Sequence, residues 1–78
     1  MQYKYIVFDN TYAVIIPSAI THADVRVRGL TPTSAGFFQL DVLNPERAKR
    51  VRVFGESESL GLSSHSKDAL LLILVLGL

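Results

Sequence analysis

The sequence has no cysteine and no tryptophan, and it contains only two histidines and one methionine among its 78 residues. Without cysteine the chain forms no disulfide and offers no thiolate for catalysis, and two histidines are few for a metal site. We therefore expect no cofactor and no bound metal. Because nothing in the composition indicates an oxidising compartment, we expect a cytoplasmic location.

An excess of charge of one sign is also missing. Eight basic residues stand against seven acidic ones, which gives a formal net charge of +1. With this balance the chain has no strong overall electrostatic attraction to nucleic acid or acidic lipid. The apolar C-terminal run Leu70–Leu78 has nine residues, whereas a membrane-spanning helix needs about 20. The first ten residues lack the basic and apolar regions of a secretory signal. We expect no membrane association.

The length limits the chain to one small domain, residues 1–78. A folded chain of this size buries about 60% of the surface that its extended form exposes. The hydrophobic gain from that burial is close in size to the opposing conformational entropy, so a monomer is only marginally stable. A short, cysteine-free chain without a targeting signal is typical of the small proteins of bacterial and phage genomes.

The N-terminal part has the pattern of a β-hairpin. Tyr3–Phe8 and Tyr12–Ile16 are rich in β-branched and aromatic residues, which favours strands. The residues between them, 9–11, are Asp-Asn-Thr, and Asn and Asp tolerate the left-handed backbone of tight turns. Pro17 ends the second strand because it cannot donate a hydrogen bond to the sheet.

The segment 18–30 fits two structures. From His22 to Arg28 apolar residues alternate with polar ones, which is the period of a half-buried strand. In favour of a helix, Thr21 and Asp24 have the spacing of a capping box and Gly29 suits the position after a helix. Four apolar residues also fall at helical spacing: Ile20, Ala23, Val27 and Leu30. We expect a short helix, with a strand as the alternative.

Two further strands follow. Residues 31–36 have the composition of a loop. Phe37–Val42 alternates and predicts a strand, and 44–50 form a long polar loop that begins with Asn-Pro. Val51–Phe54 predicts the fourth strand. The side chains expected on the inner face are Phe38, Leu40, Val42, Val51 and Val53.

The last third of the chain predicts a loop and then a helix. Residues 55–64 are rich in serine and glycine. Ser64 or Ser66 is a suitable helix cap, and Asp68 in the first turn favours the positive end of the helix dipole. The expected order is therefore ββαββα, an α+β fold with a four-stranded sheet and two short helices on one face.

The C-terminal helix has no polar face, because every residue from Ala69 to Leu76 is apolar. Such a helix is normally buried on all sides, and this chain is too small to surround it. The simpler alternative is a terminal strand or helix whose outer leucines are partly exposed. We expect instead that the outer face packs on a second copy of the chain, most simply as a two-fold homodimer. The expected interface residues are Leu70, Leu71, Leu74, Val75 and Leu78.

Six of the eight basic residues form two clusters, which suggests an alternative function. If the clusters are adjacent they make a patch for phosphates, with Tyr3 and Tyr5 on one strand face for base stacking. Pairing with Asp41 across the second hairpin is the simpler explanation for part of this charge. The residues of the alternative nucleic-acid site are Arg26, Arg28, Arg47, Lys49, Arg50 and Arg52.

The polar residues do not form a recognisable catalytic pattern. A serine nucleophile needs a base within hydrogen-bond reach, and no Gly-x-Ser-x-Gly elbow is present. We therefore expect no enzyme and no catalytic residue. The sequence predicts a small non-enzymatic protein that self-associates and binds another macromolecule. We expect this partner to be a protein, with a nucleic acid as the less favoured alternative. The residues weighed for catalysis are His22, His65, Asp24, Asp68 and the serines at 57, 59, 63, 64 and 66.

Overall fold

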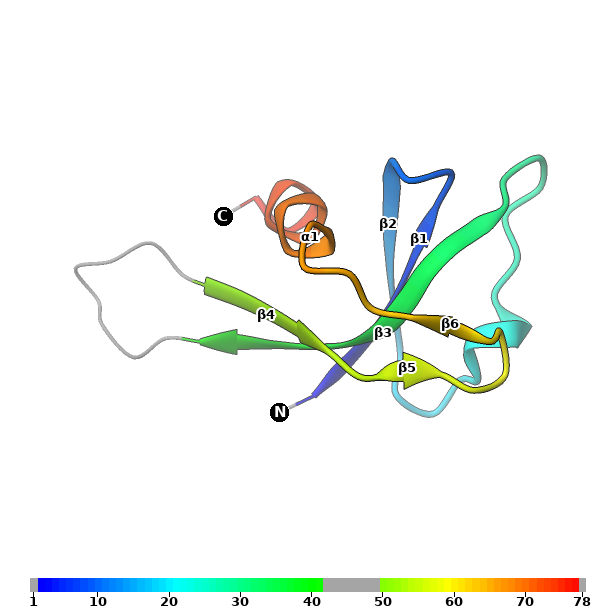
Figure 1. Cartoon of the computed structure of the whole chain (residues 1–78), viewed down its shortest axis with the longest axis horizontal. Helices are drawn as coiled ribbons and strands as arrows, with labels where there is room; N and C mark the ends of the chain where they lie inside the picture. Colours follow the sequence, from blue (N-terminus) through cyan, green and yellow to red (C-terminus); the bar gives the residue numbers. More distant parts are fainter. Residues whose placement is uncertain (1, 42–49, 78) are drawn as a thin grey trace.

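The computed structural model describes residues 2–41 and 50–77. Its main feature is a four-stranded antiparallel sheet with the strand order β2-β1-β3-β4 (Figure 1). The strands of this sheet are β1 (Tyr3–Phe8), β2 (Tyr12–Ile16), β3 (Pro32–Asp41) and β4 (Arg50–Phe54). The remaining elements are the 3₁₀ helix η1 (His22–Asp24), the short strands β5 (Glu56–Ser57) and β6 (Leu62–Ser63), and the helix α1 (Asp68–Leu76). The expected α+β fold with a four-stranded sheet is confirmed.

The predicted β1–β2 hairpin is confirmed, including the backbone of its turn. Asp9 and Asn10 have φ angles of 52° and 55°, in the left-handed region that these residue types tolerate. The Thr11 N–H donates to the Phe8 carbonyl oxygen at 3.0 Å and closes the turn.

β3 is longer than predicted, because it begins at Pro32 and includes most of the expected loop 31–36. This half of the strand pairs with β1 in the middle of the sheet. Its polar side chains find partners there: Thr33 Oγ1 donates to the Val7 carbonyl oxygen, and Ser34 Oγ donates to Asp68. The loop-like composition therefore reflects small residues at a crowded position and not an irregular backbone.

The sheet is apolar on both faces, and we call them the α1 face and the groove face. On the α1 face, the helix residue Leu72 packs against buried strand residues, namely Tyr5, Val7, Phe38 and Val51. On the groove face, the alternate side chains form a second buried cluster of Ile6, Phe8, Ile16 and Ala35. The two clusters follow the alternation of strand side chains between opposite faces.

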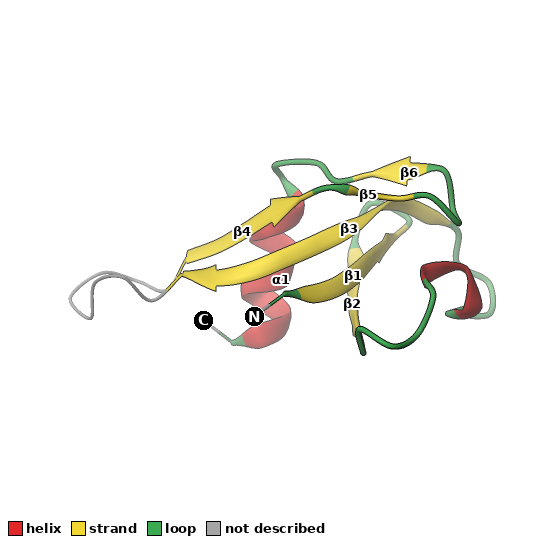
Figure 2. Ribbon diagram, turned by 90° about the horizontal axis from the view of Figure 1, so that it is seen from below, coloured by secondary structure: helices red, strands yellow, loops and turns green. Residues whose placement is uncertain are grey.

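The prediction of two helices on one face is wrong. The segment 18–30 contains only the 3₁₀ helix η1, and Thr21 makes no side-chain capping bond there. Val25 and Leu30 pack on the groove face, opposite α1. Figure 2 shows α1 behind the sheet and η1 well apart from it, near the start of β3. The order ββαββα is therefore also wrong, because this segment covers the second face without forming an α-helix.

The predicted strand β4 and the C-terminal helix are confirmed, and the serine-rich loop between them is more ordered than expected. β5 and β6 pair in an antiparallel hairpin within residues 55–64. Leu60 and Leu62 of this hairpin pack on the groove face, which fixes the hairpin against the sheet. Val42 and most of the predicted loop 44–50 lie outside the described residues.

Candidate interaction surfaces

The outer face of α1 exposes a group of large apolar side chains. Leu72 is fully buried, whereas Leu70, Leu74 and Val75 are 67%, 77% and 53% exposed. Leu71 is half-buried and packs against the α1-face core, so it contributes less to this surface than expected. The predicted interface residue Leu78 lies outside the described residues. Within the described ranges, no helix reaches the length and apolarity that crossing a bilayer requires.

The buried carboxylate of Asp68 holds the start of α1 on the sheet. It accepts hydrogen bonds from the Tyr5 hydroxyl at 2.6 Å, the Ser34 hydroxyl at 2.9 Å and the His65 backbone N–H at 3.0 Å. A buried charge is tolerated when it is satisfied in this way. The predicted cap by Ser64 or Ser66 is wrong: α1 has no side-chain cap at Lys67, and Ser64 Oγ donates to the Gly55 carbonyl oxygen.

Tyr5 is the residue whose ionisation the fold changes most clearly. Burial raises the pKa of the Tyr5 hydroxyl far above its ordinary value of 10.0, and the hydrogen bond and negative charge of Asp68 raise it further. The hydroxyl therefore keeps its proton and remains a donor to the carboxylate. Tyr5 is fully buried, so its ring is not available for stacking on bases. Tyr3 is partly buried and stacks on Phe38, with ring centroids 5.2 Å apart.

The other residues considered for catalysis are dispersed. His22 is buried, and its Nε2 carries a proton because it faces the Gly36 carbonyl oxygen at 3.0 Å, which only accepts. His65 and Asp24 are exposed on separate elements. Ser57 is buried and lies 3.3 Å from Ser59, oxygen to oxygen, in the β5–β6 hairpin. Within residues 2–41 and 50–77, no three His, Cys, Asp or Glu side chains are grouped to hold a metal ion.

Of the two basic clusters, the structure describes the side chains of Arg26, Arg28 and Arg52. Arg26 and Arg28 lie beside Pro32 at the start of β3, whereas Arg52 lies opposite Gln39 near its end. Seven residues of strand separate these positions, or about 23 Å at ~3.3 Å per residue. The backbone register of β3 and β4 places Asp41 opposite Arg50. Arg47 and Lys49 lie outside the described residues.

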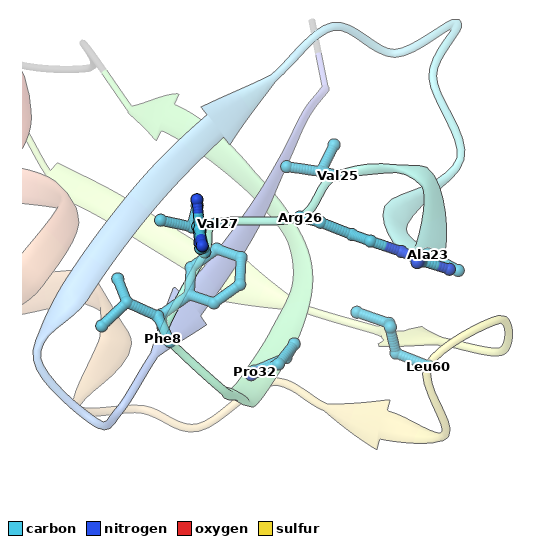
Figure 3. Close-up of a pocket in the computed structure, with 9 residues that line it drawn as sticks. Phe8, Ala23, Val25, Arg26, Val27, Pro32 and Leu60 are labelled. Atoms are coloured by element: carbon cyan, nitrogen blue, oxygen red, sulfur yellow. The ribbon is translucent and has the colours of Figure 1, made fainter.

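The groove face is hollowed into a groove of about 610 Å³. In Figure 3 the Phe8 ring lies between Val27 and Pro32, and the Arg26 side chain extends toward Ala23 and Leu60. The lining combines apolar side chains with two arginines and contains no acidic residue. Its residues are Phe8, Ala23, Val25, Arg26, Val27, Arg28, Leu30, Pro32 and Leu60.

Hydrogen bonds fix the segment that forms one wall of this groove. At its start, Lys4 Nζ donates to the Ile20 carbonyl oxygen at 2.9 Å, and His22 donates to β3. Close to the same end, the Ala23 N–H donates to Ser59 Oγ at 3.2 Å. At its end, Asp9 and Thr31 exchange two bonds, because the Thr31 N–H donates to Asp9 Oδ1 and the Asp9 N–H donates to the Thr31 carbonyl oxygen.

Sequence reasoning missed the groove, because its lining comes from β1, the segment 23–30, β3 and the β5–β6 hairpin. The local signal in the sequence is the alternation of Val25 and Val27 with Arg26 and Arg28, which by itself indicates only a half-buried strand or a short helix. The chain matches no family model, no curated protein and no solved structure.

Proposed function

We propose that this protein is a non-enzymatic, cytoplasmic interaction protein that self-associates through the outer face of α1 and binds a further macromolecule. The observation that carries this proposal is the exposure of Leu70, Leu74 and Val75 together on one helix. Leu70 and Leu74 are four residues apart, so their side chains are neighbours on the helix surface.

A second copy of the chain is the partner that suits this face best. From residue 69 to residue 76 the helix has no charged or polar side chain. A partner with charged groups at the contact would leave them desolvated without a counter-charge, which is unfavourable. A two-fold contact instead places the same apolar face on both sides.

The exposed area predicts a weak dimer. The exposed parts of Leu70, Leu74 and Val75 amount to about two whole side chains per protomer. Burying them in both protomers contributes about 6–12 kcal/mol, at ~1.5–3 kcal/mol per side chain. Association costs about 4–15 kcal/mol in lost translational and rotational freedom. The most favourable balance of the two, about 8 kcal/mol, corresponds to a dissociation constant of about 1 μM, so we expect a dimer no tighter than that.

Sedimentation equilibrium tests this proposal with three proteins: the wild type, Leu74→Asp and the control Ile20→Asp. Leu74 and Ile20 are both exposed, but only Leu74 lies on α1. At protein concentrations up to about 1 mM, we expect the wild type and Ile20→Asp to dimerise and Leu74→Asp to sediment at the monomer mass of 8.6 kDa. Circular dichroism confirms that each variant is folded. A wild type that stays monomeric at every concentration contradicts the proposal, and so does a Leu74→Asp variant that dimerises as well as the wild type.

A further inference from the structure

We propose that the groove on the groove face binds a small organic anion, an apolar body that carries one carboxylate or phosphate group. This site lies on the face of the sheet opposite α1, and it goes beyond the self-association proposed above. The size of the groove indicates a small molecule, and the charge of its lining indicates an anion. The hydrogen bonds of its wall indicate a site that is formed before binding.

The size of the groove fits a small molecule. Its volume of about 610 Å³ lies within the ~300–1,000 Å³ that is usual for small-molecule sites. Apolar side chains from three separate parts of the chain surround it, among them Phe8, Val25 and Leu60. Phe8 is 1% exposed, so its ring forms a fixed floor beneath the groove. The more exposed apolar side chains of the lining, Val27 and Leu30, offer the surface against which an aliphatic or aromatic body packs.

The charge of the lining specifies an anion. Arg26 and Arg28 are the charged residues of the lining, and both side chains are exposed. None of the hydrogen bonds or ion pairs found within the described residues engages either guanidinium. Asp24 is exposed on η1 but is not part of the lining. A guanidinium offers a planar pair of donors that matches a carboxylate or phosphate.

The groove is formed before any ligand binds. The segment that carries both arginines is held at its start by Lys4 and His22 and at its end by the paired Asp9 and Thr31. A preformed site loses little conformational entropy on binding. The arginines therefore move mainly in their side chains when an anion enters.

Calorimetry and amide NMR with four probes test the proposal: octanoate, octyl phosphate, the neutral octanol and inorganic phosphate. We expect the two amphipathic anions to bind and to shift amide signals of residues 23–30 and Leu60. Octanol lacks the charge and inorganic phosphate lacks the apolar body, so we expect each to bind about tenfold more weakly or not at all. Whichever amphipathic anion binds more tightly identifies the headgroup.

The double variant Arg26→Gln/Arg28→Gln tests the role of the two charges. We expect it to bind the amphipathic anions at least about tenfold more weakly than the wild type. Arg52→Gln, which removes one charge near the other end of β3, serves as the control and keeps full affinity. Thermal unfolding shows whether the double variant is folded. If the double variant is unfolded, Arg26→Lys/Arg28→Lys, which keeps both charges, takes its place in the titrations. In the lysine variant we expect affinity to fall several-fold but not to vanish.

Several results would overturn the proposal. One is that neither amphipathic anion binds, and another is that octanol binds as tightly as the anions do. The proposal also fails if Arg26→Gln/Arg28→Gln binds the anions as tightly as the wild type does, or if the amide shifts are confined to α1. Amide shifts in residues 23–30 that depend on protein concentration without any probe would make a second copy the occupant instead. The same titrations on Leu74→Asp separate the two proposals, because groove binding is expected to persist in a monomer.

Discussion

Replacement of Asp68 by alanine tests how the fold keeps α1 on the sheet. The carboxylate accepts three hydrogen bonds, and two of its donors, the hydroxyls of Tyr5 and Ser34, are themselves buried. In Asp68→Ala these hydroxyls lose their acceptor in an apolar environment. The helix also loses the bond from the His65 N–H, which secures the turn before it.

The expected cost is large for so short a chain. Leaving a buried hydroxyl without its partner costs about 1–3 kcal/mol, so the two hydroxyls together cost about 2–6 kcal/mol. A domain of this length has a total stability of about 4–12 kcal/mol, at ~0.05–0.15 kcal/mol per residue. Asp68→Ala is therefore expected to lose a large part of the stability of the domain, and its urea midpoint should fall well below that of the wild type. Tyr5→Phe removes one hydrogen bond to the charge and is expected to cost about 1.5–3 kcal/mol.

A double-mutant cycle separates the hydrogen bond from other effects of the two substitutions. We expect Tyr5→Phe/Asp68→Ala to cost about 1–3 kcal/mol less than the sum of the single variants, because the Tyr5 hydroxyl is then absent and only the Ser34 hydroxyl is left without its acceptor. Since the chain has no tryptophan, urea unfolding is followed by far-ultraviolet circular dichroism. Tyr12→Phe, at a tyrosine that is 55% exposed, is the control and should change stability by less than about 0.5 kcal/mol. Additive costs in the cycle would refute the reasoning.

Three further predictions concern stability. The raised pKa of Tyr5 means that above pH ~10 the unfolded chain binds fewer protons than the folded one, so the free energy of unfolding falls by about 1.4 kcal/mol per pH unit. Urea unfolding at several alkaline pH values should show this loss of stability. The loss should be smaller in Tyr5→Phe, and an equal loss in both proteins would argue that the Tyr5 hydroxyl is not buried. Gly36→Ala should destabilise by about 1–3 kcal/mol, because a Cβ there would lie 2.7 Å from the Phe54 carbonyl oxygen; unchanged thermal stability would show that the backbone adjusts freely. Leu72→Ala should cost about 2–5 kcal/mol, since Leu72 is fully buried, whereas Leu70→Ala should cost far less; similar urea midpoints for the two would mean that α1 is oriented differently.

The elements that could be predicted share a strong local pattern. β1, β2 and β4 have dense β-branched and aromatic residues, and α1 has an unbroken apolar run that begins after a polar turn. The turn at Asp9 and Asn10 was predictable because these residues tolerate the positive φ angles that it adopts. In each case neighbouring residues favour the same structure that the whole fold requires.

The elements that were mispredicted depend on distant parts of the chain. Ser34 belongs to a central strand because β1 pairs with it and because Asp68, 34 residues away, accepts a hydrogen bond from its hydroxyl. His22 lies in a short 3₁₀ helix and bonds to Gly36, so the segment around it covers the groove face without continuing as an α-helix. Neither partner can be identified from spacing alone.

The same division applies to the candidate sites. The apolar run of α1 indicates a surface that needs a partner, because its composition leaves no face for water. Which of its side chains remain outside, and the joining of Phe8, Arg26, Arg28 and Leu60 around one groove, depended on how the chain folds. The physical reason is that composition and period act over a few neighbouring residues, whereas burial and the lining of a groove arise from contacts between strands and loops that are far apart in the chain.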